Sequence, residues 1–165
     1  MPALDTLARM CEYTDMYQNT VVEVVLTVRY LDEDGEEIEQ PVWVCEGANE
    51  AGDILFSEAS PEIETAMNDA YAAFLDVVAA EFITGEKEKD MFKTMFRWGT
   101  NVNAIVFIAG TGDNGDEAPF SCILGDGEKL DLLGEGPTPE EAVAACYAKW
   151  ETTAKGRAKG AAGVK

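Results

Sequence analysis

Residues 103–151 constrain the fold most, because three short apolar runs there lead into a segment with a marked helix start. The three runs cover residues 104–109, 120–124 and 129–133. Each is typical of a short β-strand, and the third alternates apolar and polar residues. The segment therefore predicts a β-β-β-α module, and it contains no catalytic motif.

The predicted helix at the end of this module has strong local signals. Thr138 suits the N-cap, Pro139 the first helical position, and Glu141 completes a capping box. The residues expected on its apolar face are Val143, Cys146, Tyr147 and Trp150. We therefore expect this face to pack on the three strands.

The first part of the chain predicts a second set of strands in the same order. Residues 21–30 alternate, with Val28 and Tyr30 on the apolar face and Glu23, Thr27 and Arg29 on the other, and Asp34-Gly35 is typical of a hairpin turn. The return strand is expected at 37–45 and a third short strand at 54–56. Pro41 indicates that the return strand lies at an edge or contains a bulge.

Helical patterns occupy much of the remaining chain. We expect helices at residues 3–17, 61–84 and 86–98, from their apolar periodicity and from Ser60-Pro61-Glu62 before the longest of them. The predicted fold class is α+β, with an antiparallel sheet and helices packed on one face. Strands followed by a helix occur twice, at about 20–84 and 102–153, which indicates a tandem β-β-β-α pseudo-repeat.

The predicted organisation is one compact unit built from two parts and a tail. Residues 1–100 form an acidic strand-hairpin and long-helix half, residues 101–153 the β-β-β-α half, and residues 154–165 a basic, flexible tail. The chain begins without a basic and apolar signal segment and has no membrane-length apolar run. We therefore expect a cytoplasmic protein.

Charge is distributed very unevenly along the 165 residues, whose formal net charge is −20. Residues 1–85 hold 19 acidic and 2 basic residues, and residues 86–165 hold 13 acidic and 10 basic ones. The negative electrostatic field of such a chain repels nucleic acid and attracts basic surfaces. Solubility is the simpler explanation of acidity, but it does not require this asymmetry.

The composition argues against an enzyme. Histidine is absent, which removes the commonest general base and the usual zinc ligand. The four cysteines form no CxxC pair and are expected to behave as small apolar residues in a reducing compartment. No metal, cofactor or catalytic residue is predicted.

Two glycine-containing segments resemble ligand loops but fail the physical requirements. Residues 110–115 match GxGxxG, yet acidic residues and a strand follow them where a dinucleotide site needs a helix. The acidic loop starting at Asp32 has Glu37 where a calcium loop needs glycine. We interpret both as hairpin loops.

The candidate site is a set of acidic residues on the first hairpin and the long helix. Glu62, Asp69 and Asp76 recur at a seven-residue spacing, roughly 10.5 Å along a helix. Hairpin and helix would have to interleave to imitate a phosphate backbone. The predicted partner-binding residues are Asp32, Glu33, Asp34, Glu36, Glu37, Glu62, Asp69 and Asp76.

A second docking surface is conceivable on the helix at 86–98. Its apolar residues Met91, Phe92, Met95, Phe96 and Trp98 are interleaved with lysine and arginine, as in a partner-binding helix. The alternative is an ordinary helix packed on the sheet with a basic outer rim.

Residues 103–148 resemble the small domain of HicB-like antitoxins. The resemblance rests on strands followed by Gly136, a threonine N-cap at Thr138, and the helix start Glu140, Glu141 and Ala142. It implies a small α+β domain that neutralises a toxin. The compact, acidic, histidine-free chain also has the general look of small accessory proteins of bacteriophages, including inhibitors of host defence.

The leading functional prediction is a non-catalytic acidic binding or inhibitor protein. Its partner would be a protein with a basic, nucleic-acid-binding surface, and its charge would mimic nucleic acid; direct binding to nucleic acid or a membrane is not expected. The main alternative is a structural or accessory component of a phage or other assembly, docked through residues 86–98 or the basic tail. An antitoxin is the third reading, and self-association is left open.

Overall fold

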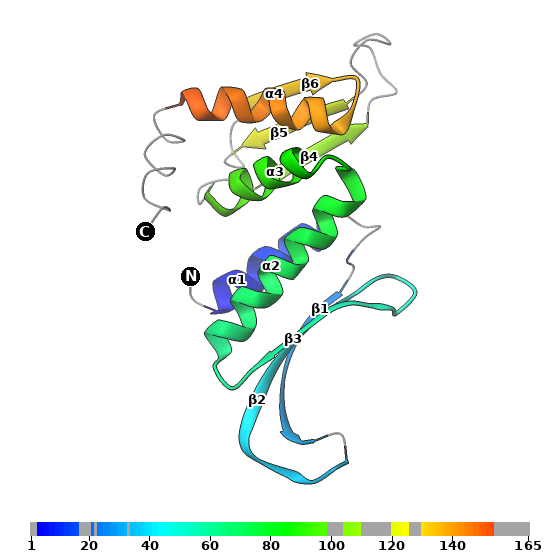
Figure 1. Cartoon of the computed structure of the whole chain (residues 1–165), viewed down its shortest axis with the longest axis vertical. Coiled ribbons are helices and arrows are strands. Elements are labelled where there is room, and N and C mark those ends of the chain that lie inside the picture. Colours follow the sequence, from blue (N-terminus) through cyan, green and yellow to red (C-terminus); the bar gives the residue numbers. More distant parts are fainter. Residues whose placement is uncertain are drawn as a thin grey trace. The chain divides into compact units, whose positions relative to one another are not determined.

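The computed structural model describes residues 3–16, 21, 23–32, 34–98, 104–109, 120–125 and 130–153. The chain forms two compact units, Met1–Val78 and Ala79–Lys165, called here the first and second unit. Their boundary falls inside one long helix, whereas the sequence placed the division after residue 100. The units are described separately, with the element labels of Figure 1.

The first unit is built on a three-stranded antiparallel sheet. Its elements are α1 (Ala3–Met16), β1 (Glu23–Leu31), β2 (Glu37–Ala48), β3 (Ile54–Ser60) and the first part of α2 (Ile63–Phe82). The strands pair in the order β1-β2-β3, so β2 is central. This is the predicted hairpin followed by a third strand and the long helix.

The β1–β2 turn forms as its sequence predicts. Gly35 has φ +82°, a conformation that residues with a side chain rarely adopt. The Asp32 carboxylate accepts hydrogen bonds from the backbone amides of Asp34 and Glu36, each at 2.9 Å. Asp32 thus satisfies two backbone amides of the turn with its own side chain.

One face of this sheet carries the helices. Phe56 of β3 meets Phe74 of α2 edge to face, with ring centroids 6.3 Å apart. The Phe56 ring lies over Gly47 of β2, where a Cβ atom would overlap it. Helix α1 contacts β1, and its buried side consists of Ala3, Thr6 and Met10. The absence of a side chain at Gly47 thus leaves room for the Phe56 ring between β2 and α2.

The pairing of β1 with β2 is interrupted near the hairpin. Arg29 pairs with Val42, but Leu31 pairs with Glu37, so β2 contains extra residues at this point. Pro41 lies among them, and proline cannot donate to a ladder. The bulge predicted from Pro41 is confirmed, in a part of β2 that has β1 but not β3 beside it.

The second unit repeats the order of three strands and a helix. It contains the end of α2, then α3 (Glu86–Trp98), β4 (Ala104–Ala109), β5 (Phe120–Gly125), β6 (Leu130–Gly136) and α4 (Pro139–Thr152). Its strands pair in the order β4-β5-β6, all antiparallel. The α+β class and the tandem β-β-β-α order are therefore confirmed.

Helix α4 lies directly against this sheet. Thr138 caps it by accepting a hydrogen bond from the amide of Glu141 at 3.2 Å. The buried residues of α4 are Ala142, Val143, Cys146 and Trp150. A Cβ atom at Gly134 of β6 would overlap the Ala142 carbonyl oxygen and the Cys146 amide nitrogen. The absence of a side chain at Gly134 thus sets how closely helix and strand approach.

Candidate protein-interaction surface

The two structural units differ sharply in charge. The first unit contains 18 acidic and two basic residues, a net charge of −16. The second contains 14 acidic and 10 basic residues, a net charge of −4. The asymmetry seen along the sequence therefore coincides with one compact unit, and the candidate surface belongs to that unit.

One of the two basic residues, Arg29, is held on the sheet face opposite the helices. Its guanidinium lies 3.1 Å from a Glu46 carboxylate oxygen, which also accepts a hydrogen bond from the Ser57 hydroxyl at 2.8 Å. The Arg9 side chain lies outside the described residues. Arg29 is thus engaged with one of the unit's own carboxylates, and the excess negative charge remains with the other acids.

The geometry of this ion pair explains a buried residue on an otherwise open face. Arg29 pairs with Val42 and Glu46 with Val25, so the arginine side chain must cross the Thr27–Val44 pair between them. Val44 is only 1% exposed. The aliphatic stem of an arginine can cover apolar surface while its charged end stays in water. Arg29 therefore shields the sheet as well as pairing with Glu46.

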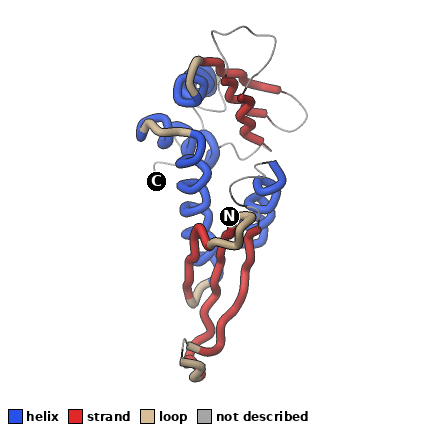
Figure 2. Tube along the Cα trace, turned by 90° about the vertical axis from the view of Figure 1, so that its right-hand side faces the viewer, coloured by secondary structure: helices blue, strands red, loops and turns tan. Residues whose placement is uncertain are grey.

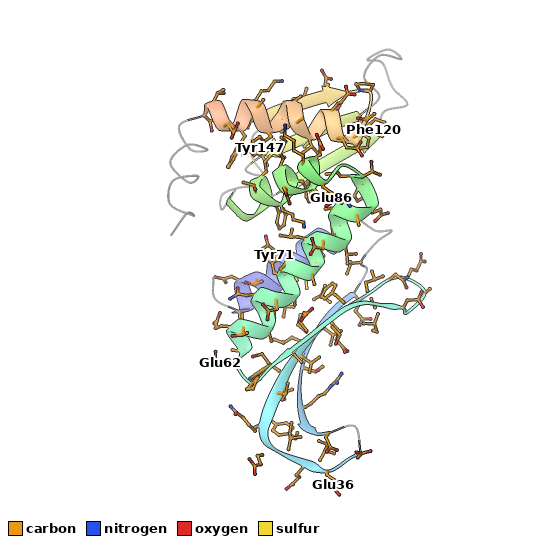
Figure 3. All side chains as sticks on the ribbon, in the orientation of Figure 1. Glu36, Glu62, Tyr71, Glu86, Phe120 and Tyr147 are labelled. Atoms are coloured by element: carbon orange, nitrogen blue, oxygen red, sulfur yellow. The ribbon has the colours of Figure 1, made fainter. Side chains whose placement is uncertain are left out.

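The predicted hairpin acids lie together at one end of the first unit. Asp32, Asp34, Glu36 and Glu37 are all exposed, and Glu33 lies outside the described residues. Figure 3 shows Glu36 at the tip of the β1–β2 hairpin. Asp32 also has the structural role in the turn described above.

The predicted helix acids lie on α2 and at its start. Glu62, Asp69 and Asp76 are exposed. The Glu62 amide donates to the Ser60 hydroxyl at 3.1 Å, and the Glu62 carboxylate accepts from the Thr65 hydroxyl at 3.3 Å. Glu62 therefore helps to organise the first turn as well as carrying charge.

Hairpin and helix acids form two separate groups. Strand β3 ends at Ser60, which pairs with Trp43, and α2 then runs back away from the tip. Asp32 lies four residues beyond Val28, the β1 partner of Trp43, which is roughly 13 Å of extended strand. Glu36 and Glu62 are accordingly well separated in Figure 3. The two groups lie one after the other and do not interleave.

The hairpin extends beyond the rest of the sheet, and this feature was not predicted. Residues 30–42, called here the acidic arm, contain six acidic residues and no basic one. Strand β3 pairs with β2 only from Trp43 onward, so the described part of the arm has no third strand beside it, and β1 and β2 pair within the arm at Leu31 and Glu37. Figure 2 shows it as the free end of the first unit's strands.

Two apolar residues of the arm are strongly exposed. Tyr30 is 60% exposed and Leu31 is 50% exposed. The alternation of β1 predicts Tyr30 on the apolar face, and it does continue the row of Val28, but β3 does not extend beside it. A signal was present in the sequence, because the two hairpin strands were predicted to be much longer than the third strand.

The apolar face of α3 is used inside the second unit. Phe92, Met95 and Phe96 are buried, Met91 is partly buried, and α3 packs against α4. The Trp98 side chain and the basic tail, residues 154–165, lie outside the described part of the chain, as do residues 110–115. The described part of this helix therefore presents no free apolar stripe for a partner.

Three of the four cysteines, Cys45, Cys122 and Cys146, are buried as small apolar residues, which confirms the prediction for them. For Cys11 the prediction is wrong, because this residue lies on the exposed side of α1. Burial raises the pKa of Cys45 to about 11. A hydrogen bond with Cys146 and burial raise the pKa of Cys122, and that hydrogen bond lowers the pKa of Cys146. Within the described ranges no three Cys, Asp or Glu side chains are grouped as a metal site would require.

No helix in the described part of the chain has both the length and the apolar character needed to cross a membrane. Comparisons with protein-family models, curated proteins and solved structures found no match to this chain. The resemblance to HicB-like antitoxins stays a prediction.

Proposed function

We propose that this protein is a non-catalytic acidic binding protein that engages the basic, nucleic-acid-binding surface of another protein. The observation that supports the proposal most is the concentration of charge in one compact unit, with 18 acidic residues against two basic ones. The basic side chain described there, Arg29, is already paired with Glu46. The first unit therefore presents an almost purely negative surface.

A negative surface of this kind selects partners by long-range attraction. It raises the association rate with positively charged proteins and repels nucleic acids and anionic membranes. Segregation of the charge supports recognition over solubility, because dispersed acids would keep a chain soluble equally well. A protein that binds the phosphates of nucleic acid has a positively charged surface, which is complementary to the negative surface of the first unit.

The acids would thus substitute for phosphates in the partner's site. The arm and α2 offer two groups of exposed carboxylates on one compact unit, which suits a surface that holds more than one stretch of nucleic-acid backbone. An inhibitor of this type, acting in the cytoplasm against a host defence enzyme as some bacteriophage proteins do, is the specific form of the proposal.

The experiment uses the whole chain and three matched variants that each remove three charges. One neutralises the hairpin (Asp32→Asn, Asp34→Asn, Glu36→Gln) and one the helix (Glu62→Gln, Asp69→Asn, Asp76→Asn). The control neutralises exposed acids of the second unit (Glu81→Gln, Asp90→Asn, Glu141→Gln). Asparagine at position 32 keeps an oxygen for the two turn amides.

Partners recovered from a host lysate are then tested as purified proteins for displacement of labelled DNA. We expect slower association for the hairpin and helix variants and for the parent at higher salt, with little change for the control. Equal rates and salt slopes for all four proteins would contradict the proposal, as would partners without a basic site.

A further inference from the structure

We infer that the acidic arm, residues 30–42, is held on both of its faces by an arginine-rich segment of the partner, with Tyr30 and Leu31 as the apolar contacts. The inference rests on the proposed function and specifies the surface that the first unit recognises.

The described residues of the arm are open on both faces because no described helix or third strand of the first unit extends beside them. Strand β3 begins pairing with β2 at Trp43, and α2 starts next to the same place and runs the other way. The turn is nevertheless fixed by Asp32, whose carboxylate holds the amides of Asp34 and Glu36. A partner thus meets a turn whose amides are already hydrogen-bonded, which reduces the entropy lost on binding.

Tyr30 and Leu31 are neighbours in β1, so their side chains point to opposite faces of this strand. Both are at least half exposed. A flat partner surface could cover only one of these two side chains. A partner segment that wraps around the acidic arm, or a cleft that receives the arm, would cover both. Exposed apolar residues on both faces therefore indicate a partner that encloses the arm.

The six carboxylates of the arm require positive charge on that partner, and Tyr30 favours arginine over lysine. A guanidinium binds a carboxylate with two parallel hydrogen bonds and also stacks on an aromatic ring. The lysine ammonium is compact and strongly hydrated, so it gains less from a tyrosine face. Acids next to an exposed tyrosine therefore discriminate between two equally charged partners.

The test measures binding of a nine-arginine peptide and a nine-lysine peptide to the whole protein by titration calorimetry at low salt. We expect the arginine peptide to bind about threefold or more tightly, the scale of an exposed cation–π contact. Tyr30→Ser and Leu31→Ser should each weaken the arginine peptide, and Tyr30→Phe should retain its affinity. Leu4→Ser is the matched control, because Leu4 is a 70% exposed apolar residue of the same unit, outside the arm.

The outcomes separate this inference from the proposed function. Equal affinity for the two peptides, or a loss for only one of the two serine variants, would overturn enclosure by arginine while leaving an acidic binding surface intact. Binding of neither peptide, or unchanged binding after neutralisation of Asp32, Asp34 and Glu36, would remove the proposed function as well. Melting curves of each variant check that it folds.

Discussion

Glu140, in the first turn of α4, binds Thr84, which lies between α2 and α3. Its carboxylate accepts hydrogen bonds from the Thr84 hydroxyl and from the Thr84 amide, the latter at 2.6 Å. These hydrogen bonds lower the pKa of Glu140 to about 2. A single carboxylate thus ties the start of α3 to the start of α4 across 56 residues of sequence.

Replacing Glu140 with glutamine should destabilise the protein. Glutamine keeps an acceptor oxygen but loses the negative charge that strengthens both hydrogen bonds and favours the N-terminal end of α4. We expect the free energy of unfolding to fall by about 1 kcal/mol, measured by chemical denaturation. Glu141→Gln is the control, since Glu141 is the exposed neighbour, and a similar loss in both variants would contradict this account.

The same carboxylate gives a pH dependence with a definite sign. Its pKa is about 2 in the folded protein and near 4.5 when unperturbed, so the folded state favours the charged form. The extra stability is fully present above pH 4.5 and is lost as the pH falls through the folded pKa.

The measurement for this prediction is the difference in unfolding free energy between the parent and Glu140→Gln, followed from pH 6 to pH 2. The difference should be largest near pH 6 and shrink toward pH 2. Protonation of the other acidic residues lowers the stability of both proteins alike, so it cancels in the difference. A difference that stays constant over this range would show that the charge of Glu140 is irrelevant.

Gly134→Ala should destabilise the second unit through backbone contact. The added methyl group would overlap the Ala142 carbonyl oxygen and the Cys146 amide nitrogen, which belong to a helix and cannot rotate away. We expect a loss of about 1–3 kcal/mol in unfolding free energy. Gly35→Ala is the comparison, because a Cβ there meets nothing within 4 Å and only the positive φ is unfavourable. Comparable melting temperatures for the parent and Gly134→Ala would show that α4 can move off β6.

The protein should not bind duplex DNA, despite the basic residues near its C-terminal end. The net charge of −20 gives a repulsion that the positions from Lys149 onward do not offset. Fluorescence anisotropy with a labelled duplex at about physiological salt checks this, with a basic DNA-binding protein as the positive control. Micromolar binding would count against a nucleic-acid mimic.

Local signals predicted the elements well because each depends on residues close together in the sequence. Thr138 and Pro139 mark the start of α4 by their own chemistry, and the alternation through Val28 marks β1. Strand β3 was predicted too short because Glu58 and Ala59 have low strand propensity. The strand is stabilised by its pairing with β2 and by the hydrogen bond from the Ser57 hydroxyl to Glu46, and neither can be predicted from the local sequence.

The candidate site was predicted in its residues but not in its arrangement. Exposure of Asp34 or Glu36 follows from a charged turn, so a single stretch of sequence suffices. The exposure of Tyr30 depends on where β3 ends and α2 begins, and the hydrogen bond between Glu140 and Thr84 joins distant residues. Neither feature produces a pattern in the local sequence, so both could be found only in the folded structure.

Arg29 limits how negative the first unit can become. Exchanging it for a neutral or acidic residue would increase the net negative charge, but it would also uncover Val44 on the open side of the sheet and leave Glu46 without its cation. Water would then reach the middle of a ladder that has no helix above it. The positive charge of Arg29 thus serves the integrity of the sheet, at the cost of one unit of the negative charge that the first unit carries.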